Sequence, residues 1–243
     1  MGRGEVLLRA TSLAASALLI LMLVAPGASP QGRQPLPEEA VRQLVAAALL
    51  QYFDPESRFE ISVQGSALSG DVLKVDVLHV VGRPAVLRGF RGEVLLHADG
   101  LELDFASLAG QQVVVRRVGK ATAVGRITAK AVEEGLAKNS SAILNPKLHF
   151  QGGEFEASAV IRRSDRLYPT LARGTLAVEN RQRVRVVVTE AKVAGGDVPQ
   201  GLIESELAKI NPVLDLSRWP LNLRIQRLTL NNDTVQMLAT TDG

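Results

Sequence analysis

The sequence predicts an α+β protein built mainly from antiparallel β-sheet. Several stretches alternate apolar and polar residues, which is the period of a strand with one buried and one solvated face. Short polar reversals separate such stretches, and hairpins of this kind join antiparallel neighbours. Three other stretches place apolar residues every three or four positions, which indicates helices. A parallel nucleotide-binding fold is therefore not expected.

Residues 1–30 are typical of an export signal. Arg3 and Arg9 form a basic start, residues 10–25 are uncharged and apolar, and residues 26–30 contain prolines and a glycine. We expect a cleaved signal peptide. The alternative is an uncleaved membrane anchor, although the apolar run is shorter than the ~20 residues that a spanning helix prefers. With either outcome the rest of the chain is expected outside the cytoplasm, in the periplasm or cell envelope.

Residues 31–37 form a polar linker, and residues 38–243 are expected to make a single domain that begins with a helix at 38–53. Acidic residues in the first turn suit the helix dipole, and Asp54-Pro55 ends the helix. Its apolar stripe consists of Val41, Leu44, Val45, Ala48, Leu49 and Tyr52.

Strands and hairpin turns are expected over most of the remaining chain. The expected strands are 58–64, 72–81, 92–105, 111–118, 154–161 and 183–188. The expected turns are 152–153, 180–182 and 231–233, which are rich in glycine and asparagine.

Two further helices are expected at 128–139 and 199–210. Thr128 is the expected N-cap of the first, and Asn211-Pro212 ends the second. Their apolar stripes contain Val132 and Leu136 in the first helix and Leu202, Ile203 and Leu207 in the second. An offset of 71 residues overlays 111–138 on 182–209 without a gap, which favours an internal strand–loop–helix repeat.

The composition excludes several kinds of chemistry. Cysteine is absent, which removes disulfides, thiolate catalysis and cysteine-held metal centres. His79, His97 and His149 are far apart in the sequence and lack metal-motif spacing, and no serine lies in a G-x-S-x-G turn. The net charge of +3 is too balanced for nucleic-acid binding. We therefore expect no enzyme activity, no cofactor, no metal and no nucleic-acid partner.

Four short patterns carry a resemblance to a known family: the extended run 100–104, the Thr128-started helix, the segment from Val198-Pro199 to Asn211-Pro212, and the final hairpin from Trp219-Pro220. On these patterns the chain from about residue 58 onward resembles the LmeA-like phospholipid-binding proteins of bacterial envelopes, relatives of tubular lipid-binding (TULIP) domains. The resemblance implies a strongly curved antiparallel sheet wrapped around long amphipathic helices, with an apolar groove for acyl chains.

The residues themselves are compatible with such a groove. Aromatic residues make up only 4% of the chain, so an aliphatic inner face can leave space that side chains do not fill. At ~0.8 kcal/mol per methylene, a ~16-carbon chain would gain roughly 10 kcal/mol before ordering costs. Besides the helix residues named above, the expected lining is Phe155, Ala157, Ala159, Ile161, Val184, Val186, Val188, Leu223 and Ile225.

Arg162, Arg163 and Arg166 are candidates to bind anionic headgroups, because guanidinium groups make bidentate contacts with phosphate. The alternative role is a solvated sheet edge that discourages aggregation. The expected function is that of an exported, non-catalytic carrier or sensor that binds phospholipid or another acyl lipid and contacts membrane surfaces transiently. The alternative is a structural or adaptor protein of the envelope, with a solid core and a protein partner of unknown identity.

Overall fold

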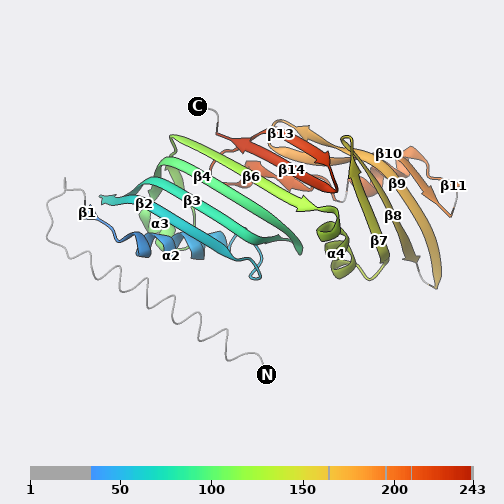
Figure 1. The fold of residues 1–243 in the computed structure, drawn as a ribbon, viewed down its shortest axis with the longest axis horizontal. Helices are drawn as coiled ribbons and strands as arrows, with labels where there is room; N and C mark the ends of the chain where they lie inside the picture. Colours follow the sequence, from blue (N-terminus) through green and yellow to red (C-terminus); the bar gives the residue numbers. More distant parts are fainter. Residues whose placement is uncertain (1–33, 164, 195, 209, 242–243) are drawn as a thin grey trace, which may run out of the picture.

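The structure is a computed structural model that describes residues 34–241 except 164, 195 and 209, with the backbone alone for residues 163, 200, 202, 203 and 206. It contains two antiparallel sheets that lie one after the other along the long axis of the molecule (Figure 1). The α+β class and the antiparallel pairing are confirmed. The expected single sheet is corrected to two, which we call sheet A and sheet B.

Sheet A combines the N-terminal strands with the C-terminal hairpin. Because β14 pairs with β6, the end of the chain returns to strands formed much earlier in the sequence. Its order is β1 (Gln34–Pro35), β2 (Phe59–Ser69), β3 (Val72–Leu87), β4 (Phe90–Asp104), β6 (Lys120–Thr128), β14 (Thr234–Thr240) and β13 (Arg224–Asn231), and β5 (Val115–Arg117) pairs with β4.

Sheet B is formed by the second half of the chain. All three predicted turns are confirmed, because residues 152–153, 180–181 and 232–233 have the positive φ that tight hairpins require. The order of sheet B is β11 (Gly196–Asp197), β10 (Arg183–Val193), β9 (Arg166–Glu179), β8 (Glu154–Arg163) and β7 (Ile143–Gln151), and β12 (Leu214–Asp215) pairs with β10.

The described helices are short: α2 (Glu38–Leu49), α3 (Phe105–Ala109), α4 (Ala129–Asn139), α5 (Gln200–Leu207) and the 3-10 turn η1 (Leu216–Arg218). Thr128 caps α4 as predicted, since its hydroxyl accepts a hydrogen bond from the Ala131 N–H. Long amphipathic helices are not confirmed, because even α2 has only 12 residues. Beyond its end, Tyr52 packs against Trp219, with ring centroids 6.0 Å apart, instead of extending the helix.

The proposed repeat is present in part. When the two segments are overlaid, helices α4 and α5 occupy corresponding positions, and β5 falls on residues 186–188 within β10. Strand β6 runs directly into α4, whereas the matching residues 191–199 contain the end of β10 and the two-residue β11. The two copies therefore share a helix and a short strand, but differ in the segment between them.

The larger core lies between α2 and sheet A. The apolar stripe of α2 faces the sheet, and both Val41 and Ala48 are 0% exposed. They belong to one cluster with the buried Leu73 of β3 and Leu103 of β4. Burying an aliphatic side chain of the size of Leu or Val contributes roughly 1.5–3 kcal/mol to the free energy of unfolding. The packing of α2 therefore covers and stabilises one face of sheet A.

The two sheets are joined at β13. The Ile225 N–H donates to the Arg181 carbonyl in the β9–β10 turn at 2.6 Å, and the Gly153 N–H of the β7–β8 turn donates to the Leu230 carbonyl at 3.0 Å. A second cluster at this junction contains the buried residues Ala129, Phe150, Phe155 and Leu230. Because partly buried Leu176 and Leu228 pack against both clusters, the apolar interior continues from sheet A onto sheet B.

Candidate lipid-binding surface

The strand register brings the aliphatic side chains of sheet B onto one face. Residues directly opposite each other in antiparallel strands project to the same side, and Ala157 of β8 pairs with both Leu148 of β7 and Ala172 of β9. Ala172 in turn lies opposite Ala191 of β10. We call this side the inner face; its members include Leu148, Phe150, Phe155, Ala157, Ala159, Ile161, Tyr168, Thr170, Ala172, Gly174, Leu176, Val184, Val186, Val188 and Ala191.

The opposite face of sheet B is charged and solvated. Arg173 of β9 forms an ion pair with Glu156 of β8 at 3.1 Å. Lys192 lies 2.6 Å from Glu190, and its hydrogen bond lowers the pKa of the Glu190 carboxyl, which keeps that group ionised at neutral pH. These ion pairs give the opposite face a charged character, although Val160, Leu167 and Leu171 also project from it.

The half of the inner face nearest β13 is filled by the protein itself. Phe155 is buried in the junction cluster, and Ala157, Val186 and Val188 pack against the same cluster. Val184 is buried in the larger core. These five residues, which the sequence predicted as lining, therefore contact protein on at least part of their surface.

The half remote from β13 is different. Ala159, Ile161, Tyr168 and Ala172 are each only half-buried, and none belongs to either cluster. The side chains of Ala159 and Ala172 are small, so they project less far from the sheet than the neighbouring side chains of Ile161 and Tyr168. In the described part of the molecule, other protein atoms therefore cover this largely aliphatic half only in part.

Side chains form hydrogen bonds with the backbone groups of single residues on the outer sides of β7 and β10. The Glu133 carboxylate of α4 accepts a hydrogen bond from the Leu148 N–H at 2.8 Å on the β7 edge. On the β10 edge, the Asn211 side chain accepts from the Val186 N–H and donates to its carbonyl, both at 2.9 Å. The backbone groups of Leu148 and Val186 that take part in these bonds are therefore not free to bind a ligand, whereas the inner face is.

The other predicted lining residues are distributed as follows. Those of α2, namely Val41, Leu44, Val45 and Ala48, together with Leu223 and Ile225, are buried in the larger core, and Leu49 packs against it. Val132, Leu136 and Leu207 are half-buried, as is Tyr52. The side chains of Leu202 and Ile203 lie outside the described residues.

The arginine candidates lie at the β8–β9 hairpin. Arg162 and Arg166 are exposed there, one near the end of β8 and the other at the start of β9. The side chain of Arg163 is outside the described part of the structure, although its backbone pairs with Arg166. This hairpin is the end of sheet B remote from β13 (Figure 1).

Two polar features were not predicted. His79 and His97, distant in sequence, lie opposite each other on β3 and β4 with their Nδ1 atoms 3.2 Å apart, and His97 Nε2 lies 3.0 Å from Asp99. No group of three or more metal-ligating side chains occurs among the described residues. The pairing of β3 with β4 places these two histidines side by side. Their spacing in the sequence does not indicate that they are neighbours.

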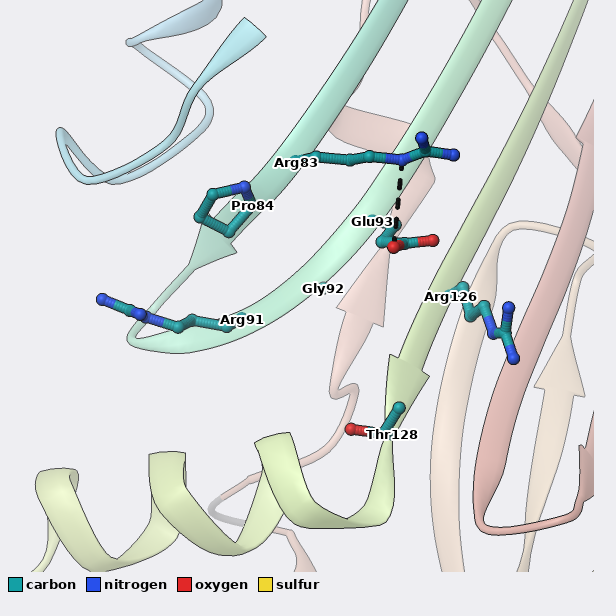
Figure 2. Close-up of a pocket in the computed structure, with 7 residues that line it drawn as sticks. All are labelled: Arg83, Pro84, Arg91, Gly92, Glu93, Arg126 and Thr128. Atoms are coloured by element: carbon teal, nitrogen blue, oxygen red, sulfur yellow. Dashed lines mark ion pairs between the residues drawn. The ribbon is translucent and has the colours of Figure 1, made fainter.

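The second unpredicted feature is a cleft of about 320 Å³ over β3, β4 and β6, several of whose lining residues are charged. Arg83 lies 3.8 Å from Glu93 across it, and the side chains of Arg91 and Arg126 extend in opposite directions (Figure 2). The guanidinium groups therefore do not converge on one anion. The cleft is lined by Arg83, Pro84, Arg91, Gly92, Glu93, Arg126 and Thr128.

Fold and surface together define a β-rich protein with a partly exposed, largely aliphatic face on sheet B. None of the helices in the described ranges has the length and apolarity to cross a bilayer. The model of the LmeA-like phospholipid-binding family matches residues 36–240, and the chain belongs to this family. The resemblance noted from the sequence is thereby confirmed. No match was found among the curated proteins or the solved structures.

Proposed function

We propose that this chain is an exported, non-catalytic phospholipid-binding protein of the cell envelope, acting as a carrier or sensor. The observation that carries the proposal is the half-buried remote half of the inner face, around Ala159 and Ala172. An acyl chain laid on this surface would be withdrawn from water along with the aliphatic side chains beneath it. Six buried methylenes contribute roughly 5 kcal/mol before ordering costs.

Membership of a phospholipid-binding family supports the nature of the ligand. The basic and apolar start of the sequence supports export. The adaptor alternative would use a sheet edge or an exposed face to hold a protein partner. Side-chain hydrogen bonds to β7 and β10 already occupy part of the edges of sheet B. A binding protein that shields acyl chains also requires no reactive side chain.

Lipid extraction of the purified full chain tests the proposal. Extraction and mass spectrometry are expected to recover phospholipid at about one molecule per chain, and a chain stripped of lipid is expected to take up phospholipid from vesicles. A maltose-binding protein purified from the same cells serves as the control for adventitious lipid. Recovery of no more lipid than the control, together with no uptake from vesicles, would refute lipid binding.

A further inference from the structure

The β8–β9 hairpin, at the remote end of sheet B, carries an exposed leucine. Leu167 is 59% exposed, the highest value among the large hydrophobic side chains that the structure describes. It lies opposite Arg162 in the β8–β9 register, and the next pair inward, Ile161 with Tyr168, belongs to the inner face. Because successive residues of a strand project to opposite sides of a sheet, Leu167 points away from the inner face and lies one residue pair beyond it, at the same end of the strands.

Among the described residues, two arginines at the same end form no ion pair. Elsewhere in sheet B, Arg173 pairs with Glu156 and Arg185 with Glu179 at 3.1 and 3.3 Å. Arg162 has no carboxylate within ion-pair distance in the described residues, and the same is true of Arg166. Leu167 lies opposite one of these arginines in the strand register and next to the other in the sequence, so an exposed leucine and two arginines without ion pairs share the hairpin.

We propose that Arg162, Arg166 and Leu167, here called the tip patch, dock the protein onto an anionic phospholipid bilayer. The two guanidinium groups bind lipid phosphates, which they match in charge and in hydrogen-bonding geometry. Leu167 enters the boundary between headgroups and acyl chains, as apolar side chains of peripheral proteins do. The proposal rests on the proposed function, because docking at this end places the inner face beside the lipids it is to bind.

The position of the tip patch suits this role. Strand β8 ends and β9 begins at the end of the molecule opposite α2 and β1 (Figure 1). A bilayer contacted there meets the ends of the strands rather than the flat charged face of sheet B. An acyl chain leaving the bilayer would pass Ile161 and Tyr168 before it reached Ala159 and Ala172.

Site-specific fluorescence tests the docking directly, because the chain contains no cysteine. The variant Leu167→Cys is labelled with the environment-sensitive dye NBD, and Leu50→Cys, at the end of α2 and 46% exposed, is the matched control. Both are full-length chains with the same first thirty residues, so any membrane contact by that segment is common to both. Vesicles are phosphatidylcholine with or without 30% phosphatidylglycerol.

We expect the emission at position 167 to shift to the blue and to be quenched by nitroxide-labelled lipids on anionic vesicles, with little change on neutral ones. Emission from position 50 should not respond. Arg162→Gln with Arg166→Gln in the Leu167→Cys background should weaken the response about 25-fold, at about fivefold for each charge. The control pair, Arg117→Gln with Arg126→Gln on sheet A, removes equal charge and should leave it unchanged.

An equal response at positions 50 and 167, no response at either, or equal losses from the two arginine pairs would each overturn docking by the tip patch. A self-association role for the patch predicts a response that depends on protein concentration without vesicles. Lipid content measured on the same samples separates the two proposals. A chain that docks but carries no lipid contradicts the proposed function alone, and a loaded chain that fails to respond contradicts the docking alone.

Discussion

Replacing Ala172 with tryptophan should lower the phospholipid bound by the chain at least tenfold. Ala172 lies on the inner face between Ala157 of β8 and Ala191 of β10 and is only half-buried. An indole at this position occupies the volume in which an acyl chain would lie. Displacing about two methylenes costs ~1.6 kcal/mol, which corresponds to more than a tenfold loss of affinity.

The matched control is Ala177→Trp. Ala177 is on the same strand and is also half-buried, but its register partner Arg185 places it on the charged face. Titration of each variant with a fluorescent phospholipid, alongside thermal unfolding, separates loss of binding from loss of structure. Equal lipid binding by Ala172→Trp and the unmodified chain would exclude the inner face as the site, and a similar loss in Ala177→Trp would point to a general effect of the larger side chain.

Replacing Gly174 with alanine should lower the free energy of unfolding by about 3 kcal/mol. A methyl group at this position would overlap the Val187 carbonyl oxygen and lie 2.9 Å from both Phe155 Cζ and Val188 Cα. Two of these atoms are backbone atoms of β10, so relief requires the β9–β10 pairing to shift. Overpacking of this kind in a dense core typically costs 1–3 kcal/mol, and displaced backbone places this case at the upper end.

Urea unfolding followed by circular dichroism measures this effect. Gly201→Ala is the control, because an added methyl there meets no atom within 4 Å, and alanine favours the helical backbone of α5 by roughly 0.5–1 kcal/mol. The midpoint should fall for Gly174→Ala and stay or rise slightly for Gly201→Ala. An unchanged midpoint for Gly174→Ala would mean that β9 and β10 are not as closely paired as described.

Local features of the fold could be predicted because their causes are local. The Asn232-Asp233 turn follows from the tolerance of these residues for positive φ, and the Thr128 cap follows from a hydroxyl placed before a helical stripe. The five-residue α3 was missed. It is specified by Asp104, whose carboxylate caps the Ser107 N–H at 2.8 Å, within a stretch that otherwise has a strand pattern.

The division into two sheets could not be predicted in the same way. It depends on which strands pair, and β14 pairs with β6 across more than half of the described chain. The period of the apolar pattern gives a face for each strand but no neighbour. The helix lengths were overestimated for a related reason, since Tyr52 continues the helical spacing in sequence while packing against a distant tryptophan in the structure.

The candidate surface was predicted in part. The alternation at 154–161 placed Phe155, Ala157, Ala159 and Ile161 on a common face, and the register agrees. The sequence did not distinguish Phe155, which is buried against β13, from Ile161, which is not. That difference arises because β13 covers only one half of the face, a contact between segments distant in the chain.

The central claim, that the remote half of the inner face holds an acyl chain, is tested most directly by photo-crosslinking. The full chain would be loaded with a phosphatidylcholine that carries a diazirine in one acyl chain, illuminated, digested and mapped by mass spectrometry. We expect the adducts to concentrate at Ala159, Ile161, Tyr168 and Ala172 on β8 and β9. Adducts confined to α2 and sheet A, or spread equally over the charged face of sheet B, would contradict it.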